Sequence, residues 1–100
     1  MSEWTSASVV IRHEVGLHAR PSVKLTKLAK SFAAAIEIAG APEGPWIDAK
    51  SIVKVMAMKA KQDSTLYLRA RGDNAAAAVT ALVGLVEHDF DEDKADAAGG

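Results

Sequence analysis

The decisive stretch of the sequence is Gly16-Leu17-His18-Ala19-Arg20-Pro21-Ser22, which joins a pattern typical of a strand to a pattern typical of a helix. Proline is tolerated at the first helical position because its missing N–H would have no intrahelical partner there, and Gly16 lets the preceding loop turn. We therefore expect a helix to begin at Pro21, with His18 at or next to its N-cap.

The start of such a helix is a favourable place for an anion, because it offers unpaired N–H groups and the positive end of the helix dipole. Arg20 adds a planar fork of donors that suits phosphate oxygens. These residues indicate that His18 holds a phosphoryl group on its imidazole. The competing interpretation is a capping or loop histidine with no chemical role, which is the more common case for a single histidine near a helix start.

The residues before this loop have the pattern of a strand. Between residues 7 and 13, Ala7, Val9 and Ile11 alternate with side chains that point the other way, as in a strand with one buried face. His13 ends the inward set, and we assign it no task.

The helix that follows the motif extends to about Phe32. Its apolar positions recur at three- and four-residue steps and form one stripe: Leu25, Leu28, Ala29 and Phe32. The opposite side carries lysines at 24, 27 and 30, which we interpret first as a solvated helix face. Lys24 and Lys27, one and two turns from the His18 end, are also candidates to guide an acidic partner.

A hairpin is expected next in the chain. Residues 33–39 carry Ile36 and Ile38, and residues 40–45 are rich in glycine and proline, which favours a turn. Residues 46–48 then return as a short strand, with Trp46 partly exposed on the sheet.

Ser51 precedes an apolar run and is a good N-cap for a short helix over about 52–58. Val55 and Met58 would face the core of the domain. So short an element cannot also bury the remaining apolar side chains, which are Ile52, Val53 and Met56. The exposed patch is either a case of imperfect burial or a surface on which partners dock.

The last two elements are a strand and a helix. Residues 64–70 alternate with Leu66 and Leu68 inward, and residues 74–87 form a helix whose cap is Asp73 or Asn74. The buried positions of this helix are Ala78, Leu82 and Leu85, flanked by Val79 and Val86. His88 is placed to interact with the negative end of the helix dipole.

The element order is therefore β-α-β-β-α-β-α, which predicts an α+β fold with a four-stranded antiparallel sheet covered on one face by three helices. One hundred residues suffice for one domain and no more. We expect a folded domain over residues 1–88 and a disordered acidic tail over 89–100.

Composition excludes several classes of function. With 49% hydrophobic and 25% charged residues the chain resembles a soluble globular protein, and the absence of cysteine excludes disulfides and thiol chemistry. No apolar run approaches the ~18 residues of a membrane span, and the N-terminus lacks the pattern of a signal peptide. We expect a cytoplasmic protein without membrane insertion, metal or cofactor. No second acid or base is evident, which argues against a free-standing enzyme.

Charge is distributed unevenly along the chain. Residues 1–86 hold 11 Lys/Arg against 7 Asp/Glu, and residues 87–100 hold 1 against 6. The basic residues are not interleaved with aromatic ones, so the pattern does not favour nucleic-acid binding. A mildly basic body fits an acidic protein partner better.

The decisive motif resembles the active-site signature of the histidine-containing phosphocarrier (HPr) family of the bacterial sugar phosphotransferase system, Gly-Leu-His-Ala-Arg-Pro-Ala, at six of seven positions. Lys50-Ser51-Ile52 followed by Val55-Met56 is similar to a second segment of that family, Lys-Ser-Ile-Met-Gly-Leu-Met. The likeness covers roughly residues 6–88. It implies an open-faced β-sandwich with the element order given above.

The resemblance implies that His18 accepts a phosphoryl group on Nδ1 from phosphorylated enzyme I and passes it to the A component of a sugar permease. Arg20 would neutralise the phosphate in transit. The supporting helix start would consist of Ala19, Pro21 and Ser22. The protein would then be a carrier and not an enzyme, and we expect a monomer.

The resemblance also implies regulatory and docking roles. Ser51 matches the serine that HPr kinase/phosphorylase modifies in many relatives, although plain helix capping explains it equally well. Ile52, Val53 and Met56 match the apolar surface that contacts partners.

Three features depart from the family pattern: Lys54 replaces a glycine, Ser22 replaces a small apolar residue, and the 41–45 loop is longer. They leave open which partners bind best and whether a kinase acts on Ser51. Two other functions also stay open, namely a carrier of the regulatory, nitrogen-related branch and an interaction module that is never phosphorylated.

Overall fold

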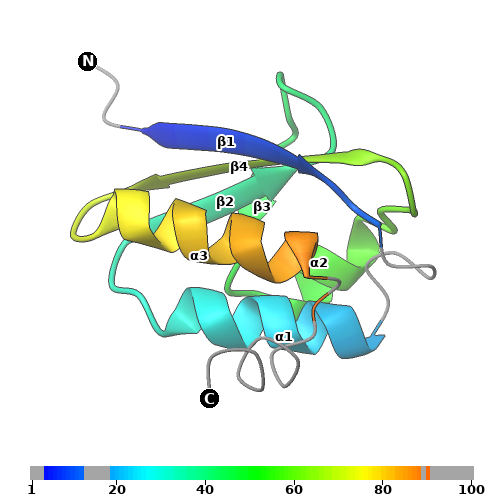
Figure 1. The fold of residues 1–100 in the computed structure, drawn as a ribbon, viewed down its shortest axis with the longest axis horizontal. Coiled ribbons are helices and arrows are strands. Elements are labelled where there is room, and N and C mark those ends of the chain that lie inside the picture. The colour runs from blue at the N-terminus through cyan, green and yellow to red at the C-terminus, as the bar shows by residue number, and fades with distance from the viewer. Residues whose placement is uncertain (1–3, 13–18, 89, 91–100) are drawn as a thin grey trace.

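The structure is a computed structural model that describes residues 4–12, 19–88 and 90. The described strands are β1 (Thr5–Val10), β2 (Ala35–Ala39), β3 (Ile47–Asp48) and β4 (Thr65–Arg71). The helices are α1 (Ala19–Lys30), α2 (Ile52–Ala57) and α3 (Ala75–Glu87). The strands form one antiparallel sheet in the order β1-β4-β2-β3, and the helices lie on one side of it (Figure 1). The predicted fold class and element order are confirmed.

The core lies between the sheet and the helices, and it contains the side chains that strand alternation predicted. β1 ends at Val10, but Ile11 is fully buried and its N–H donates to the Ser64 carbonyl over 2.9 Å. The other strand residues of the core are Val9, Ile36, Ile38, Leu66, Leu68 and Ala70. The helices contribute Leu25, Ala29, Val55, Ala78, Val79, Leu82, Leu85 and Val86. Leu28, Phe32 and Met58 pack against this core while only partly buried.

Helix α1 begins at Ala19, two residues earlier than predicted, so Pro21 occupies the third helical position. Proline is equally tolerated there, because the first four N–H groups of a helix have no intrahelical partner. The buried side of α1 also includes two polar residues, Ser22 and Thr26. Thr26 satisfies its hydroxyl within the helix, where Oγ1 donates to the Ser22 carbonyl over 3.0 Å.

The uncovered face of the sheet carries a stacked cluster centred on Arg69. The guanidinium lies between the rings of Trp4 and Trp46, 4.2 Å from each ring centroid. Glu37, directly across from Arg69 on β2, accepts hydrogen bonds from Arg69 Nε and Nη2 at 2.9 and 2.6 Å. These contacts explain why Trp46 is half-buried, as expected, at the end of a two-residue strand.

The prediction that Asp73 or Asn74 caps α3 is confirmed in position, but the cap makes no side-chain hydrogen bond. Asn74 occupies the N-cap position, but its backbone is left-handed at φ 60°, and neither it nor Asp73 makes a capping hydrogen bond through its side chain. A capping side chain needs an extended N-cap backbone, which Asn74 does not have. The backbone closes the turn instead, since Ala75 N–H donates to the Gly72 carbonyl.

The buried part of the chain continues past the C-terminal end of α3, further than expected. His88 Nδ1 lies 2.7 Å from the Gly84 carbonyl, in agreement with its expected place at the negative end of the helix. Phe90 is only 2% exposed, and its N–H donates to the Leu85 carbonyl over 2.8 Å. A core residue therefore lies two positions beyond the boundary expected at 88. Residues 91–100 of the expected tail lie outside the described residues.

Candidate functional site

Only part of the site predicted from the sequence lies within the described residues. His18 and the loop residues from His13 onward, Gly16 included, lie outside them, and the description resumes at Ala19, the next residue in the chain. Ala19 and Arg20 are exposed, whereas Pro21 and Ser22 are buried. In the first turn of α1, Ala19 and Arg20 therefore face solvent, whereas Pro21 and Ser22 pack against the protein.

Arg20, a predicted phosphate ligand, lies in the first turn of α1. Its side chain is exposed, and none of the described residues forms a salt bridge with its guanidinium. The N–H groups at positions 19 and 20 belong to the first turn, where N–H groups have no partner within the helix, and position 21 is proline. Ser22 is fully buried.

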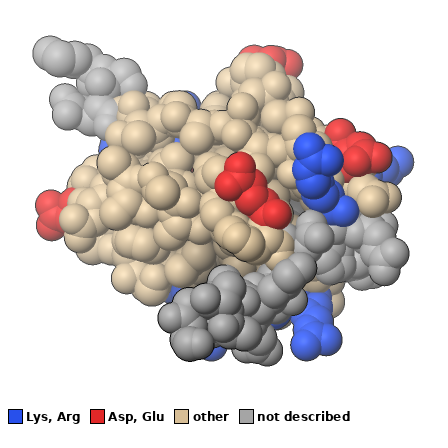
Figure 2. All heavy atoms as spheres, in the orientation of Figure 1, with Lys and Arg blue, Asp and Glu red and all other residues tan. Residues whose placement is uncertain are grey.

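The outer side of α1 is basic, as predicted. Lys27 and Lys30 are exposed and Lys24 is half-buried, and basic side chains project along the edge of the molecule where α1 lies (Figure 2). In the described part of the chain the only ion pair joins Arg69 to Glu37, far from this helix in the sheet. Lys24 and Lys27, the two lysines nearer the start of α1, thus remain available to an acidic partner.

Ser51 is the N-cap of α2, in agreement with the sequence prediction. Its backbone is extended, and its hydroxyl accepts a hydrogen bond from the Lys54 N–H over 3.3 Å. The neighbouring Lys50 donates from Nζ to the Phe32 carbonyl over 2.8 Å, just beyond the end of α1. This long-range bond ties the start of α2 to the end of α1, a role for Lys50 that the sequence did not reveal.

The predicted apolar patch on α2 is present. Val53 is 74% exposed and Met56 40% exposed, while Val55 is fully buried and Ile52 is half-buried. Val23 on α1 is also exposed, at 53%. Its position outside the buried stripe of α1 is the one sequence signal that could have identified it as exposed. Helix α1 packs against α2. We name Val23, Ile52, Val53 and Met56 the apolar patch.

Two other features are absent from the described part of the chain. No group of three or more His, Cys, Asp or Glu residues there could hold a metal ion. None of the helices there is both long and apolar enough to cross a bilayer.

An open-faced sheet with three helices on one side, and an exposed arginine in the first turn of the first helix, are the features that the resemblance to phosphocarrier proteins predicts. Comparison with known proteins places the chain in a particular family. The family model described as "PTS HPr component phosphorylation site" matches residues 5–88. The chain belongs to the HPr family of the phosphotransferase system.

Individual relatives agree with this assignment. The chain is 39% identical to a phosphocarrier protein HPr of Cupriavidus necator over 82 residues, which are 82% of this chain and 90% of the relative. It is 32% identical to a phosphocarrier protein NPr of Proteus mirabilis, over 85% of this chain and 93% of the relative. The crystal structure of HPr-C-His from Thermoanaerobacter tengcongensis superimposes with a TM-score of 0.80 at 32% identity, covering 88% of this chain and 97% of that one.

Family membership settles the general role of the protein. It is a phosphocarrier of the phosphotransferase system and not a catalyst, and a phosphohistidine is the form in which such a protein carries its cargo. Relatives named HPr and relatives named NPr both match, so the comparisons leave open which branch of the system it serves.

Proposed function

We propose that the protein accepts a phosphoryl group on His18 from phosphorylated enzyme I and passes it to the A component of a permease in the cytoplasm. The observation that carries the proposal is the exposed Arg20, without a described ion-pair partner, in the first turn of α1 directly after His18. Incubation with enzyme I and phosphoenolpyruvate tests it, and the expected product is a phosphate that is labile in acid and stable in base.

The chemistry requires little beyond the imidazole. A neutral imidazole is a nucleophile near pH 7, because its ordinary pKa is about 6.5. Nδ1 would attack phosphorus, the new P–N bond would form as the bond to the donor breaks, and the same steps in reverse would load the acceptor. The arriving group brings roughly two negative charges.

Arg20 and the N–H groups of the helix start would stabilise this charge by about 1–3 kcal/mol in an exposed position. A modest stabilisation suits a carrier, because a site that bound phosphate too tightly would not release it. Lys24, Lys27 and the apolar patch would hold the partner while the group moves.

We assign the carrier to the sugar branch, supported by the higher identity to the HPr of Cupriavidus necator, 39%, than to the NPr of Proteus mirabilis, 32%. The nitrogen-related branch is the alternative. Transfer rates from the enzyme I of each branch separate them, and a faster reaction with the nitrogen-branch donor would reverse the assignment.

Replacing Arg20 by alanine should slow phosphoryl acceptance about 10-fold, since a charge-assisted hydrogen bond to the phosphate contributes about 1.5 kcal/mol. Initial rates with phosphorylated enzyme I measure this. Arg20→Lys should recover only part of the rate, because an ammonium lacks the planar fork. Lys30→Ala, which removes an exposed charge at the far end of α1, is the matched control and should keep the normal rate. A normal rate in Arg20→Ala would remove Arg20 from the mechanism.

We further propose that phosphorylation of Ser51 inhibits the carrier, because it adds negative charge beside the apolar patch. Ser51→Ala should lower the free energy of unfolding by about 1 kcal/mol through loss of the cap, whereas Ser51→Asp should retain capping. Ser51→Asp should nevertheless accept phosphate from enzyme I more slowly than Ser51→Ala. Equal rates in the two variants would leave Ser51 as a structural cap.

A further inference from the structure

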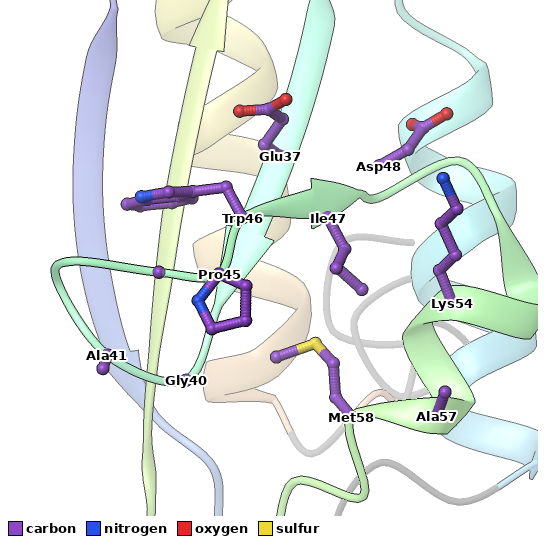
Figure 3. Close-up of a pocket in the computed structure, with 11 residues that line it drawn as sticks. Glu37, Gly40, Ala41, Pro45, Trp46, Ile47, Asp48, Lys54, Ala57 and Met58 are labelled. Atoms are coloured by element: carbon purple, nitrogen blue, oxygen red, sulfur yellow. The ribbon is translucent and has the colours of Figure 1, made fainter.

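A cavity of about 700 Å³ lies between the β2–β3 hairpin and α2, outside the site described above (Figure 3). Pro45 and Ile47 line it from the hairpin, and Ala57 and Met58 line it from the end of α2. The side chains of Ile47 and Met58 point toward each other across it. The interior of the cavity is therefore mainly apolar.

The hairpin holds this cavity in a defined shape. Gly44 has φ +95°, and a Cβ atom there would come within 2.9 Å of Trp46 N, so no larger residue fits this turn. Gly44 N–H donates to the Ala41 carbonyl over 3.0 Å. Trp46 is fixed by its stacking on Arg69, and its indole extends over β4 (Figure 3).

The ammonium of Lys54 lies at the rim of the cavity. Within the described residues its ammonium has no hydrogen-bond or ion-pair partner. Two carboxylates also line the cavity. Glu37 is paired with Arg69, whereas Asp48 keeps its negative charge and accepts only the Lys50 N–H, through Oδ1 over 2.9 Å.

The cavity adjoins the apolar patch. Lys54 and Ala57 line the cavity, and their chain neighbours Val53 and Met56 are the exposed members of the patch on α2. A partner seated on the patch would therefore reach the cavity from the same helix. Lys54 and the 41–45 loop are also positions at which the sequence departs from the family motif.

We infer that this cavity is a specificity site for an acidic protein partner: it receives a large apolar side chain of the partner, and Lys54 binds a carboxylate next to that side chain. The inference rests on the proposed function, because the partner is one that exchanges phosphate with the protein. Continuity with the patch and the rim ammonium of Lys54 are what favour a protein segment as the occupant.

Two variants test the inference with the full chain. Lys54→Glu reverses the rim charge, and Ala57→Trp fills the cavity from an exposed helix position. Transfer rates from phosphorylated enzyme I, and to the A component, are measured over a range of partner concentrations. For at least one partner, each variant should raise KM about 10-fold and change kcat less than about 2-fold. Lys30→Glu makes the same charge change outside the cavity and should leave both constants within about 2-fold.

The outcomes separate this inference from the proposed function. Normal transfer by the unmodified protein, with KM unchanged for both partners in both variants, would overturn the cavity inference alone. No phosphate on the unmodified protein would overturn both. Self-association that Ala57→Trp abolishes, with KM unchanged, would assign the cavity to a second copy and also contradict the inference. Lys54 is exposed, so Lys54→Glu gives a valid test even if Ala57→Trp disturbs the fold.

Discussion

His18→Ala is expected to abolish phosphoryl acceptance from phosphorylated enzyme I while leaving the fold intact. The described core consists of side chains from the sheet and the three helices, and we expect far-UV circular dichroism and the unfolding midpoint to stay normal. The loss of phosphate should be complete, because the variant has no nucleophile at the start of α1. Incubation with enzyme I and labelled phosphoenolpyruvate measures it.

His88→Ala is the matched control for this experiment. His88 is exposed, and its ring lies against the Gly84 carbonyl at the end of α3, so the variant loses an imidazole of no chemical role. It should accept phosphate at the normal rate. Retained labelling in His18→Ala, or lost labelling in His88→Ala, would contradict the assignment of the acceptor.

The second large effect concerns stability and Phe90. Phe90→Ala should lower the free energy of unfolding by about 3–5 kcal/mol, the usual cost of removing a buried phenylalanine ring. Urea denaturation measures this. A chain that ends after His88 should lose a similar amount, because it lacks the same ring.

A chain that ends after Phe90 is the control for both. It keeps the ring and removes residues 91–100, so its stability should stay within about 0.5 kcal/mol of the full chain. Equal stability of the chains ending at 88 and at 90 would show that Phe90 contributes nothing to the core. In that case residue 88 would be the functional boundary of the domain.

Much of the fold is predictable from the sequence because its periodicities are strong. Leu66 and Leu68 alternate with polar neighbours, and Leu25 and Ala29 recur at a helical step. These patterns indicate which side of each element is buried. Ser51 was also predictable, because a serine directly before an apolar run has few other interpretations than an N-cap.

Other features were hidden because they depend on tertiary contacts. Phe90 follows the last helix among acidic residues, and only its place in the core distinguishes it from the tail. Asn74 has a good capping side chain, but its backbone is left-handed and the side chain makes no capping hydrogen bond. The stacking of Arg69 between Trp4 and Trp46 joins residues far apart in sequence, and no local pattern predicts it.

The site was predictable in its chemistry and less so in its surroundings. Arg20 is exposed as the motif suggested, whereas Ser22 of the same motif is buried against the core. The cavity beside α2 could not be predicted at all, because a hairpin and a helix far apart in the sequence enclose it.

The most direct test of the central claim is to locate the phosphate on the unmodified protein after incubation with enzyme I and phosphoenolpyruvate, by fragmentation mass spectrometry at alkaline pH. We predict one phosphoryl group per chain, on His18, labile in acid and stable in base. Phosphate on His88 or Ser51 instead, or no phosphate on the chain, would contradict the account.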